Sequence, residues 1–155
     1  MIAKSDRVRR LAALSFSEML VLLACSFGLT AMSLALRWMP TRRVLAWAQR
    51  PRVHARRSPV HSLALSRLVY LIDVAARHLP VRANCLAKSL LLSRHMSKRD
   101  LPYELVIGVR LIGHALSAHA WIEFDGIPVN DTLAVTGQFH RITGRLPSYM
   151  TFDER

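Results

Sequence analysis

The sequence predicts an α+β fold in which helices come first and an antiparallel sheet follows. Apolar residues recur at helical spacing through most of the chain up to about Ser97. After Asp100 the pattern changes, because Tyr103–Arg110 is rich in β-branched residues and Ser117–Phe124 alternates between polar and apolar residues. Asp125-Gly126 then gives a strong hairpin signal. We therefore expect a helix packed on an antiparallel sheet.

The amino-terminal part combines an apolar run with a basic linker. Residues 11–36 are nearly all apolar, and Glu18 is their only charge. A bilayer span needs about 20 apolar residues, so membrane association through residues 11–36 is one interpretation. Small and polar residues interrupt the run, however, and arginines flank both of its ends. The pattern favours two buried helices with a break near Gly28. Met39-Pro40 would end the second of them, and a short helix from Thr41 to Ala48 would follow.

Two further helices are expected before the sheet. Ser58-Pro59 is typical of a helix start, and apolar spacing continues to about Arg77. Leu79-Pro80 would end that helix, and Asn84 is a strong N-cap for the next one, which we expect to run from Cys85 to about Ser97. The organisation predicted is a helical region with a basic linker over residues 1–57 and a core over residues 58–155, which together form one compact unit.

Composition limits the classes of function. The chain has 155 residues, which suits one domain, and a net charge of +12. Such a charge attracts nucleic acid, anionic lipid or acidic peptides. The basic linker has no interleaved aromatic residues, so we expect no nucleic-acid partner. Cys25 and Cys85 form no Cys-x-x-Cys pair and there is no phosphate-loop motif, so we expect no metal, no cofactor and a reduced cytoplasmic setting.

Three residues have types and positions that suit nucleophilic catalysis. Cys85 lies in the first turn of a predicted helix, where the helix dipole favours a thiolate. His119 lies on the predicted strand, on a partly open face shared with Trp121 and Glu123, and could act as a base. Asp131 follows across the hairpin on the expected returning strand, Ile127 to Asp131, and could orient the histidine. Each residue alone is weak evidence, whereas the order Cys, His, Asp on helix, strand and next strand is more specific.

Four segments resemble the transglutaminase-like peptidases of lasso-peptide biosynthesis. The segments are Cys85-Leu86-Ala87-Lys88-Ser89-Leu90, Val106-Ile107-Gly108-Val109, Ala118-His119-Ala120-Trp121-Ile122-Glu123 and Gly126-Ile127-Pro128-Val129-Asn130-Asp131. The resemblance implies a transglutaminase/papain-like core, with Cys85 as nucleophile, His119 as base and Asp131 as the orienting residue. It also implies a cysteine endopeptidase that cuts the leader from a ribosomally made precursor peptide, after which a separate lasso cyclase closes the ring.

The resemblance also implies a partner. In some members of that family a leader-recognition domain is fused ahead of the peptidase, and in others it is a separate protein. The helical amino-terminal region resembles the split form, which implies a separate leader-recognition protein. Two other classes of function stay open, a basic binding module and a membrane-attached accessory protein without catalysis. Acyl transfer to an amine is a close variant of the peptidase reaction.

Overall fold

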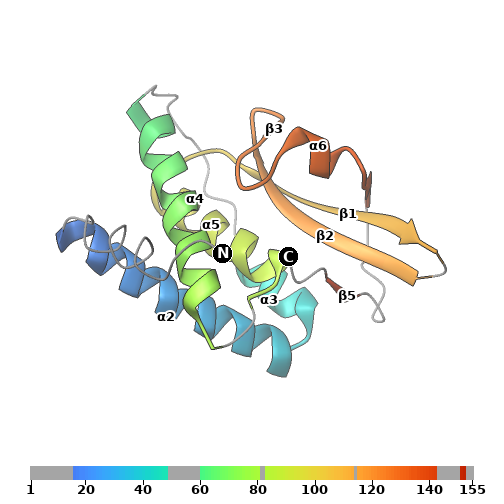
Figure 1. The fold of residues 1–155 in the computed structure, drawn as a ribbon, viewed down its shortest axis with the longest axis horizontal. Helices are drawn as coiled ribbons and strands as arrows, with labels where there is room; N and C mark the ends of the chain where they lie inside the picture. Colours follow the sequence, from blue (N-terminus) through green and yellow to red (C-terminus); the bar gives the residue numbers. More distant parts are fainter. Residues whose placement is uncertain (1–15, 49–59, 81–82, 114, 143–150, 153–155) are drawn as a thin grey trace, which may run out of the picture.

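A layer of helices and an antiparallel sheet meet at one central helix, α5 (Figure 1). This computed structural model describes residues 16–48, 60–80, 83–113, 115–142 and 151–152. The helices are α2 (Phe16–Trp38), α3 (Thr41–Ala48), α4 (Val60–His78), α5 (Cys85–Lys98) and α6 (Leu133–Thr136). The strands are β1 (Glu104–Ile112), β2 (Ala115–Phe124), β3 (Ile127–Pro128), β4 (His140–Arg141) and β5 (Thr151–Phe152).

The order of these elements confirms the α+β prediction. Helix α3 has the predicted bounds, and α5 extends one residue past the predicted end at Ser97. Helix α4 begins at Val60, while the expected start at Ser58-Pro59 lies outside the described residues. The predicted boundary between residues 57 and 58 also lies outside them and stays a prediction.

Helix α2 is continuous, so the predicted break near Gly28 is wrong. Its buried stripe contains Cys25, Leu29 and Met32, and it packs against α4 and α5. A Cβ atom on Gly28 would lie 2.7 Å from Cδ1 of Leu91 in α5, so the glycine permits a close approach of the two helices. Gly28 therefore serves a helix contact rather than a turn.

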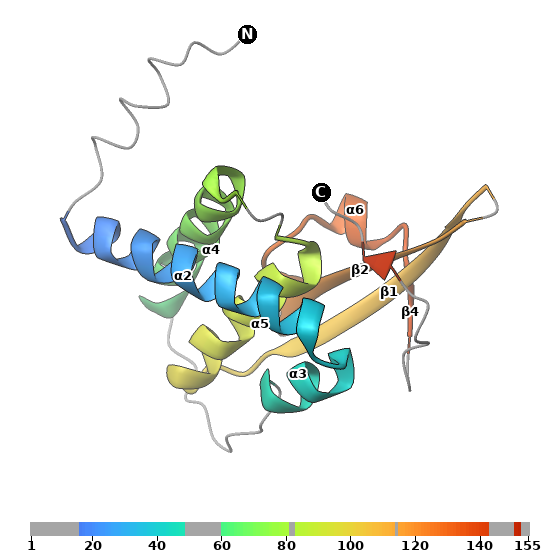
Figure 2. The same ribbon diagram turned by 90° about the horizontal axis from the view of Figure 1, so that it is seen from below.

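The other side of α2 is exposed, which corrects the expectation that this region is buried. Phe16, Leu23, Phe27 and Trp38 are between 60% and 83% exposed. By length and composition alone, Glu18–Trp38 could cross a membrane, since its mean hydropathy is 2.2. Figure 2 shows α2 running across α5, and α3 lies beside the carboxyl-terminal half of α2. Membrane association stays a prediction.

The sheet has the strand order β3-β2-β1-β4, and β5 pairs with β2 in parallel. Strands β1 and β2 are antiparallel along their whole length. The turn from β2 to β3 places Asp125 and Gly126 at φ values of 52° and 77°, and two successive left-handed residues are typical of a type I′ hairpin. The hairpin is confirmed, but the returning strand ends at Pro128 instead of continuing to Asp131.

Both faces of β2 are buried at its centre. Ala118, Ala120 and Ile122 are at most 1% exposed, as expected for the core face. The opposite face was predicted to be partly open, yet His119 and Trp121 are 7% and 1% exposed. Phe139, from the segment after α6, contacts both rings and covers this face. Alternation on β2 alone does not reveal this covering, since the segment comes from later in the chain.

Candidate active site

Cys85 lies at the amino terminus of α5, as predicted. Asn84 caps this helix: its backbone is extended, and its side-chain oxygen accepts a hydrogen bond of 2.9 Å from the amide of Ala87. The cap satisfies one of the amides that the first turn leaves without a helical partner. The thiol is therefore held in the first turn, near the positive end of the helix dipole.

His119 and Asp131 are hydrogen-bonded to each other. Nε2 of His119 donates to Oδ2 of Asp131 at 2.5 Å, and Oδ1 of Asp131 accepts from the amide of Thr132 at 2.7 Å. With its proton on Nε2, a neutral imidazole presents the lone pair of Nδ1 on its other side. The ring also packs against the rings of Trp121 and Phe139, with centroids 5.8 Å and 5.1 Å away. Both the tautomer and the ring plane are thus set by named neighbours.

One cavity of about 240 Å³ brings the three predicted residues together. Cys85 reaches it from α5, His119 from β2, and Asp131 from the bend after β3. The other residues that line it are Asp73, Lys88, Ala120, Asn130, Val135 and Phe139. A thiol, an imidazole and a carboxylate therefore line one shared cavity.

A chain of hydrogen bonds joins the three elements that carry these residues. Ser89, one turn after Cys85 on α5, donates to the carbonyl of Ala120 on β2 at 2.9 Å. Asn130 donates from Nδ2 to the hydroxyl of Ser89 at 3.0 Å, and its Oδ1 accepts from the amide of Ile122 at 2.7 Å. Asn130 is therefore bound to the helix and to the strand, and it directly precedes Asp131.

The edge of β2 leaves space for this chain of hydrogen bonds. Strand β5 pairs with β2 at Ser117 and Ala118, while β3 pairs with it at Glu123 and Phe124. Between these two pairings, polar side chains from other elements bond to the backbone of β2. Helix α5 can therefore approach the middle of the strand, beside His119.

Several cavity residues were missed by the sequence reasoning. Lys88 forms a 3.2 Å ion pair with Asp73 of α4, and both line the cavity. The sequence did contain a signal for Lys88. Lys88 comes three residues after Cys85 on the same helix, so the two side chains lie on one face. Asp73 and Phe139 gave no signal, since they come from elements remote in sequence. The only sequence signal for Asn130 was its position beside Asp131, in one of the segments that carry the family resemblance.

A second buried polar group stabilises the face of β2 that carries His119. The carboxylate of Glu123 accepts from Nε1 of Trp121 at 2.8 Å and forms an ion pair with Arg141 of β4. Burial acts to raise the pKa of Glu123, but the hydrogen bonds from Arg141 and Trp121 and the charge of Arg141 outweigh it, so the pKa is lowered. The group therefore stays ionised while buried.

Cys25 has a different environment. It is fully buried in the apolar cluster between α2 and α4, and burial raises the pKa of its thiol to about 11. Such a thiol stays protonated at neutral pH. Within the described residues, no group of three or more His, Cys, Asp or Glu side chains is arranged to hold a metal ion.

The comparisons with known proteins agree with this architecture. No curated protein and no solved structure matches the chain. The family model described as Transglutaminase-like superfamily matches residues 26–144, which is more than half of the chain and includes Cys85, His119 and Asp131. This superfamily generally includes cysteine peptidases and transglutaminases. The chain therefore belongs to the transglutaminase-like superfamily.

Proposed function

We propose that the chain is a cysteine endopeptidase in which Cys85 is the nucleophile, His119 the general base and Asp131 the residue that orients the histidine. The observation that carries this proposal is the 2.5 Å hydrogen bond from His119 to Asp131 beside a cavity that Cys85 also lines. A base held in one tautomer by a carboxylate, with a thiol lining the same cavity, is the kind of arrangement that nucleophilic catalysis uses.

In the proposed reaction, Nδ1 of His119 takes the proton of the Cys85 thiol. The sulfur then attacks the carbonyl carbon of the scissile peptide bond, and backbone amides of the first turn of α5 stabilise the oxyanion. The carbon–nitrogen bond breaks as the amine leaves with the proton from His119. A water molecule, deprotonated by the same nitrogen, attacks the thioester and releases the carboxylate and the free thiol.

The proposed substrate is a ribosomally made lasso-peptide precursor, from which the enzyme removes the leader. Support for this substrate comes from the sequence resemblance around Cys85, His119 and Asp131. A separate leader-recognition protein would present the precursor and a lasso cyclase would close the ring. The proposed location is the cytoplasm, with membrane association through residues 11–36.

A cleavage assay read by mass spectrometry tests this proposal. The full chain is mixed with a candidate precursor and the matching leader-binding protein, and Cys85→Ala and Cys25→Ala variants are run in parallel. We expect wild type and Cys25→Ala to produce a leader fragment and a core fragment whose masses sum to the precursor plus one water, and Cys85→Ala to produce neither. Cleavage by Cys85→Ala at the wild-type rate would refute the assignment of the nucleophile.

The same mass spectra distinguish hydrolysis from acyl transfer. Hydrolysis adds one water to the products, whereas transfer to an amine gives a product that contains the added amine. Including a small primary amine such as glycine methyl ester in the assay therefore decides between them. We expect the water adduct to remain the main product.

A non-catalytic role as a membrane-attached accessory protein is the second candidate, and the exposed apolar side of α2 favours it. Fractionation of cells that express the chain tests it. Recovery in the membrane fraction after a high-salt wash, together with unchanged precursor processing by Cys85→Ala, would support the accessory role.

A further inference from the structure

We propose that the groove between α2, α3 and α5 is a docking site for an acidic amphipathic helix of a separate partner protein. This inference does not depend on the peptidase reaction, because it concerns a different surface from the cavity that Cys85 lines. It assigns a binding surface to the helical region and states the chemistry of the partner that would fit it.

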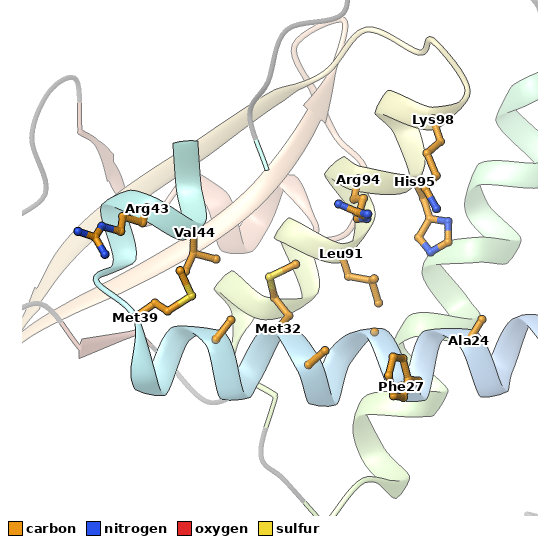
Figure 3. Close-up of a pocket in the computed structure, with 13 residues that line it drawn as sticks. Ala24, Phe27, Met32, Met39, Arg43, Val44, Leu91, Arg94, His95 and Lys98 are labelled. Carbon is orange, nitrogen blue, oxygen red and sulfur yellow. The ribbon is translucent and has the colours of Figure 1, made fainter. Parts of the chain in front are cut away.

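The groove is an elongated apolar hollow of about 670 Å³ (Figure 3). Its floor contains side chains of α2 together with Leu91 of α5 and Val44 of α3. Phe27 is 79% exposed at one edge, so a large aromatic ring faces solvent there. An apolar hollow whose lining follows α2 from Ala24 to Ala35 suits the apolar face of a helix, which presents side chains at positions i, i+3, i+4 and i+7.

Two methionines make this floor adaptable. Met32 and Met39 both line the groove, and Figure 3 shows Met32 pointing from α2 toward α5 and Met39 beside Val44 of α3. Methionine is flexible and polarizable, and it is used repeatedly at surfaces that accept helices. The floor can therefore adjust to apolar side chains of different shape.

The polar wall of the groove is cationic. Arg94, His95 and Lys98 line it from α5, and Arg43 lines it from α3. Among the described residues, no acidic side chain lines this groove. Burial lowers the pKa of His95, and the charges of Lys98, Arg99 and Arg94 lower it further, which reflects the positive potential along this wall. Carboxylates on the docked helix would complement that potential.

Charge complementarity argues against the amino-terminal segment and the basic linker of this chain as the occupant. Residues 1–15 contain Lys4, Arg7, Arg9 and Arg10 against a single acidic residue, and residues 49–59 contain arginines and no acidic residue. Both would meet a wall of the same sign. The concave shape argues against a flat lipid surface, which would contact the exposed side of α2 without filling the hollow.

Helix α5 belongs to both the groove and the cavity. Cys85 and Lys88 line the cavity from its first turns, while the later turns supply one wall of the groove. A partner docked in the groove would therefore be held on the same rigid element as the thiol.

A display library tests the proposal without knowledge of the natural partner. The library presents 18-residue helices with leucine at i, i+3, i+4 and i+7, and the other positions are drawn from Glu, Lys, Gln and Ser. It is selected on the full-length wild-type chain. We expect glutamate to be enriched over lysine at the positions that flank the leucines, and the selected peptides to bind more weakly as salt is raised.

Matched variants locate the binding site. The Kd of a selected peptide is measured by fluorescence anisotropy against Phe27→Ser and Lys98→Glu in the groove. The controls are Leu23→Ser, an exposed residue of the same helix outside the groove, and Arg77→Glu, an exposed residue of α4. We expect each groove variant to weaken binding by at least about tenfold and each control by less than about twofold. Circular dichroism of all four variants checks that a weaker affinity does not come from loss of folding.

Three results would overturn the proposal. They are selection of peptides without acidic residues, equal weakening by the groove and control variants, and failure to select any peptide. A parallel arm uses phosphatidylglycerol vesicles. Binding to these vesicles that is lost in Phe27→Ser and Lys98→Glu, with no peptide selected, would assign the groove to an anionic lipid surface instead.

Discussion

The two cysteines of this chain are almost equally buried, yet their surroundings differ completely. Cys25 is 0% exposed among apolar side chains of α2 and α4, and its thiol pKa is raised to about 11. Cys85 is 3% exposed, but it begins α5 and lines a cavity with His119 and Asp131. Burial therefore does not distinguish the proposed nucleophile from the other thiol. The position at a helix terminus and the histidine and carboxylate that line the same cavity do.

The largest effect we expect comes from Cys85→Ala. This substitution removes the proposed nucleophile, so cleavage of a precursor should fall by about 10⁴-fold or more. Cys25→Ala should leave kcat within about twofold of wild type, since Cys25 is remote from the cavity. The measurement is initial rate by mass spectrometry for both variants. Equal losses in both would show that the comparison between the two thiols is wrong.

Asp131→Asn should have the next largest effect. Asparagine keeps the shape of the side chain but can turn its amide donor toward His119, which disfavours the tautomer with a proton on Nε2. We expect kcat to fall by about 10²–10⁴-fold with little change in KM, because acid–base catalysis contributes about that factor. Steady-state kinetics separates the two parameters. A loss confined to KM would mean that Asp131 positions substrate instead of the histidine.

Acid should destabilise the fold through Glu123. Because the folded-state pKa of Glu123 is lowered below 4.5, its ionised form stabilises the fold above pH 4.5, and that stabilisation is lost as the pH falls through the folded-state pKa. We expect Glu123→Gln to lower the free energy of unfolding by about 1 kcal/mol at pH 7, a modest value because the side chain of Arg141 is 49% exposed.

Urea denaturation at pH 7 and at successively lower pH measures this contribution. The difference between wild type and Glu123→Gln should shrink as the pH is lowered. A difference that stays constant across the series would show that the carboxylate charge does not contribute to stability.

The last effect, similar in size to that of Glu123→Gln, should be that of Cys25→Ala on stability. Truncation leaves a small cavity in the cluster between α2 and α4, which should lower the free energy of unfolding by about 1 kcal/mol.

Iodoacetamide sharpens the contrast between the thiols, because it reacts with a thiolate. We expect peptide mapping after native-state labelling at pH 7 to find the adduct on Cys85 before Cys25. Faster labelling of Cys25 would contradict the inferred difference in environment.

Local sequence signals predicted much of the fold. Asn84 placed the start of α5 and Asp125-Gly126 placed the hairpin turn, because an N-cap and a two-residue turn depend on side chains near in sequence. The apolar run of α2 misled the prediction. Its composition is compatible with burial, and only tertiary packing shows that Gly28 contacts Leu91 while Phe27 faces solvent.

The three candidate residues could be chosen from the sequence, but the contacts that hold them in place could not. The order of Cys85, His119 and Asp131 on helix, strand and returning segment follows from element types alone. The hydrogen bonds of Asn130 and the packing of Phe139 on His119 could not be predicted, because they join elements whose relative placement is set by the whole fold.

The hairpin turn at Asp125 and Gly126 separates two of the candidate site residues from the third along the chain. Cys85 and His119 lie before it, and Asp131 lies after it. A polypeptide cut at this turn would give one fragment with the thiol and the base and another with the carboxylate and the asparagine that anchors it. If the proposed cleavage activity returned on mixing, it would signal that the fragments had reassociated. The turn is therefore a suitable point at which to divide the protein into a two-component reporter of molecular proximity.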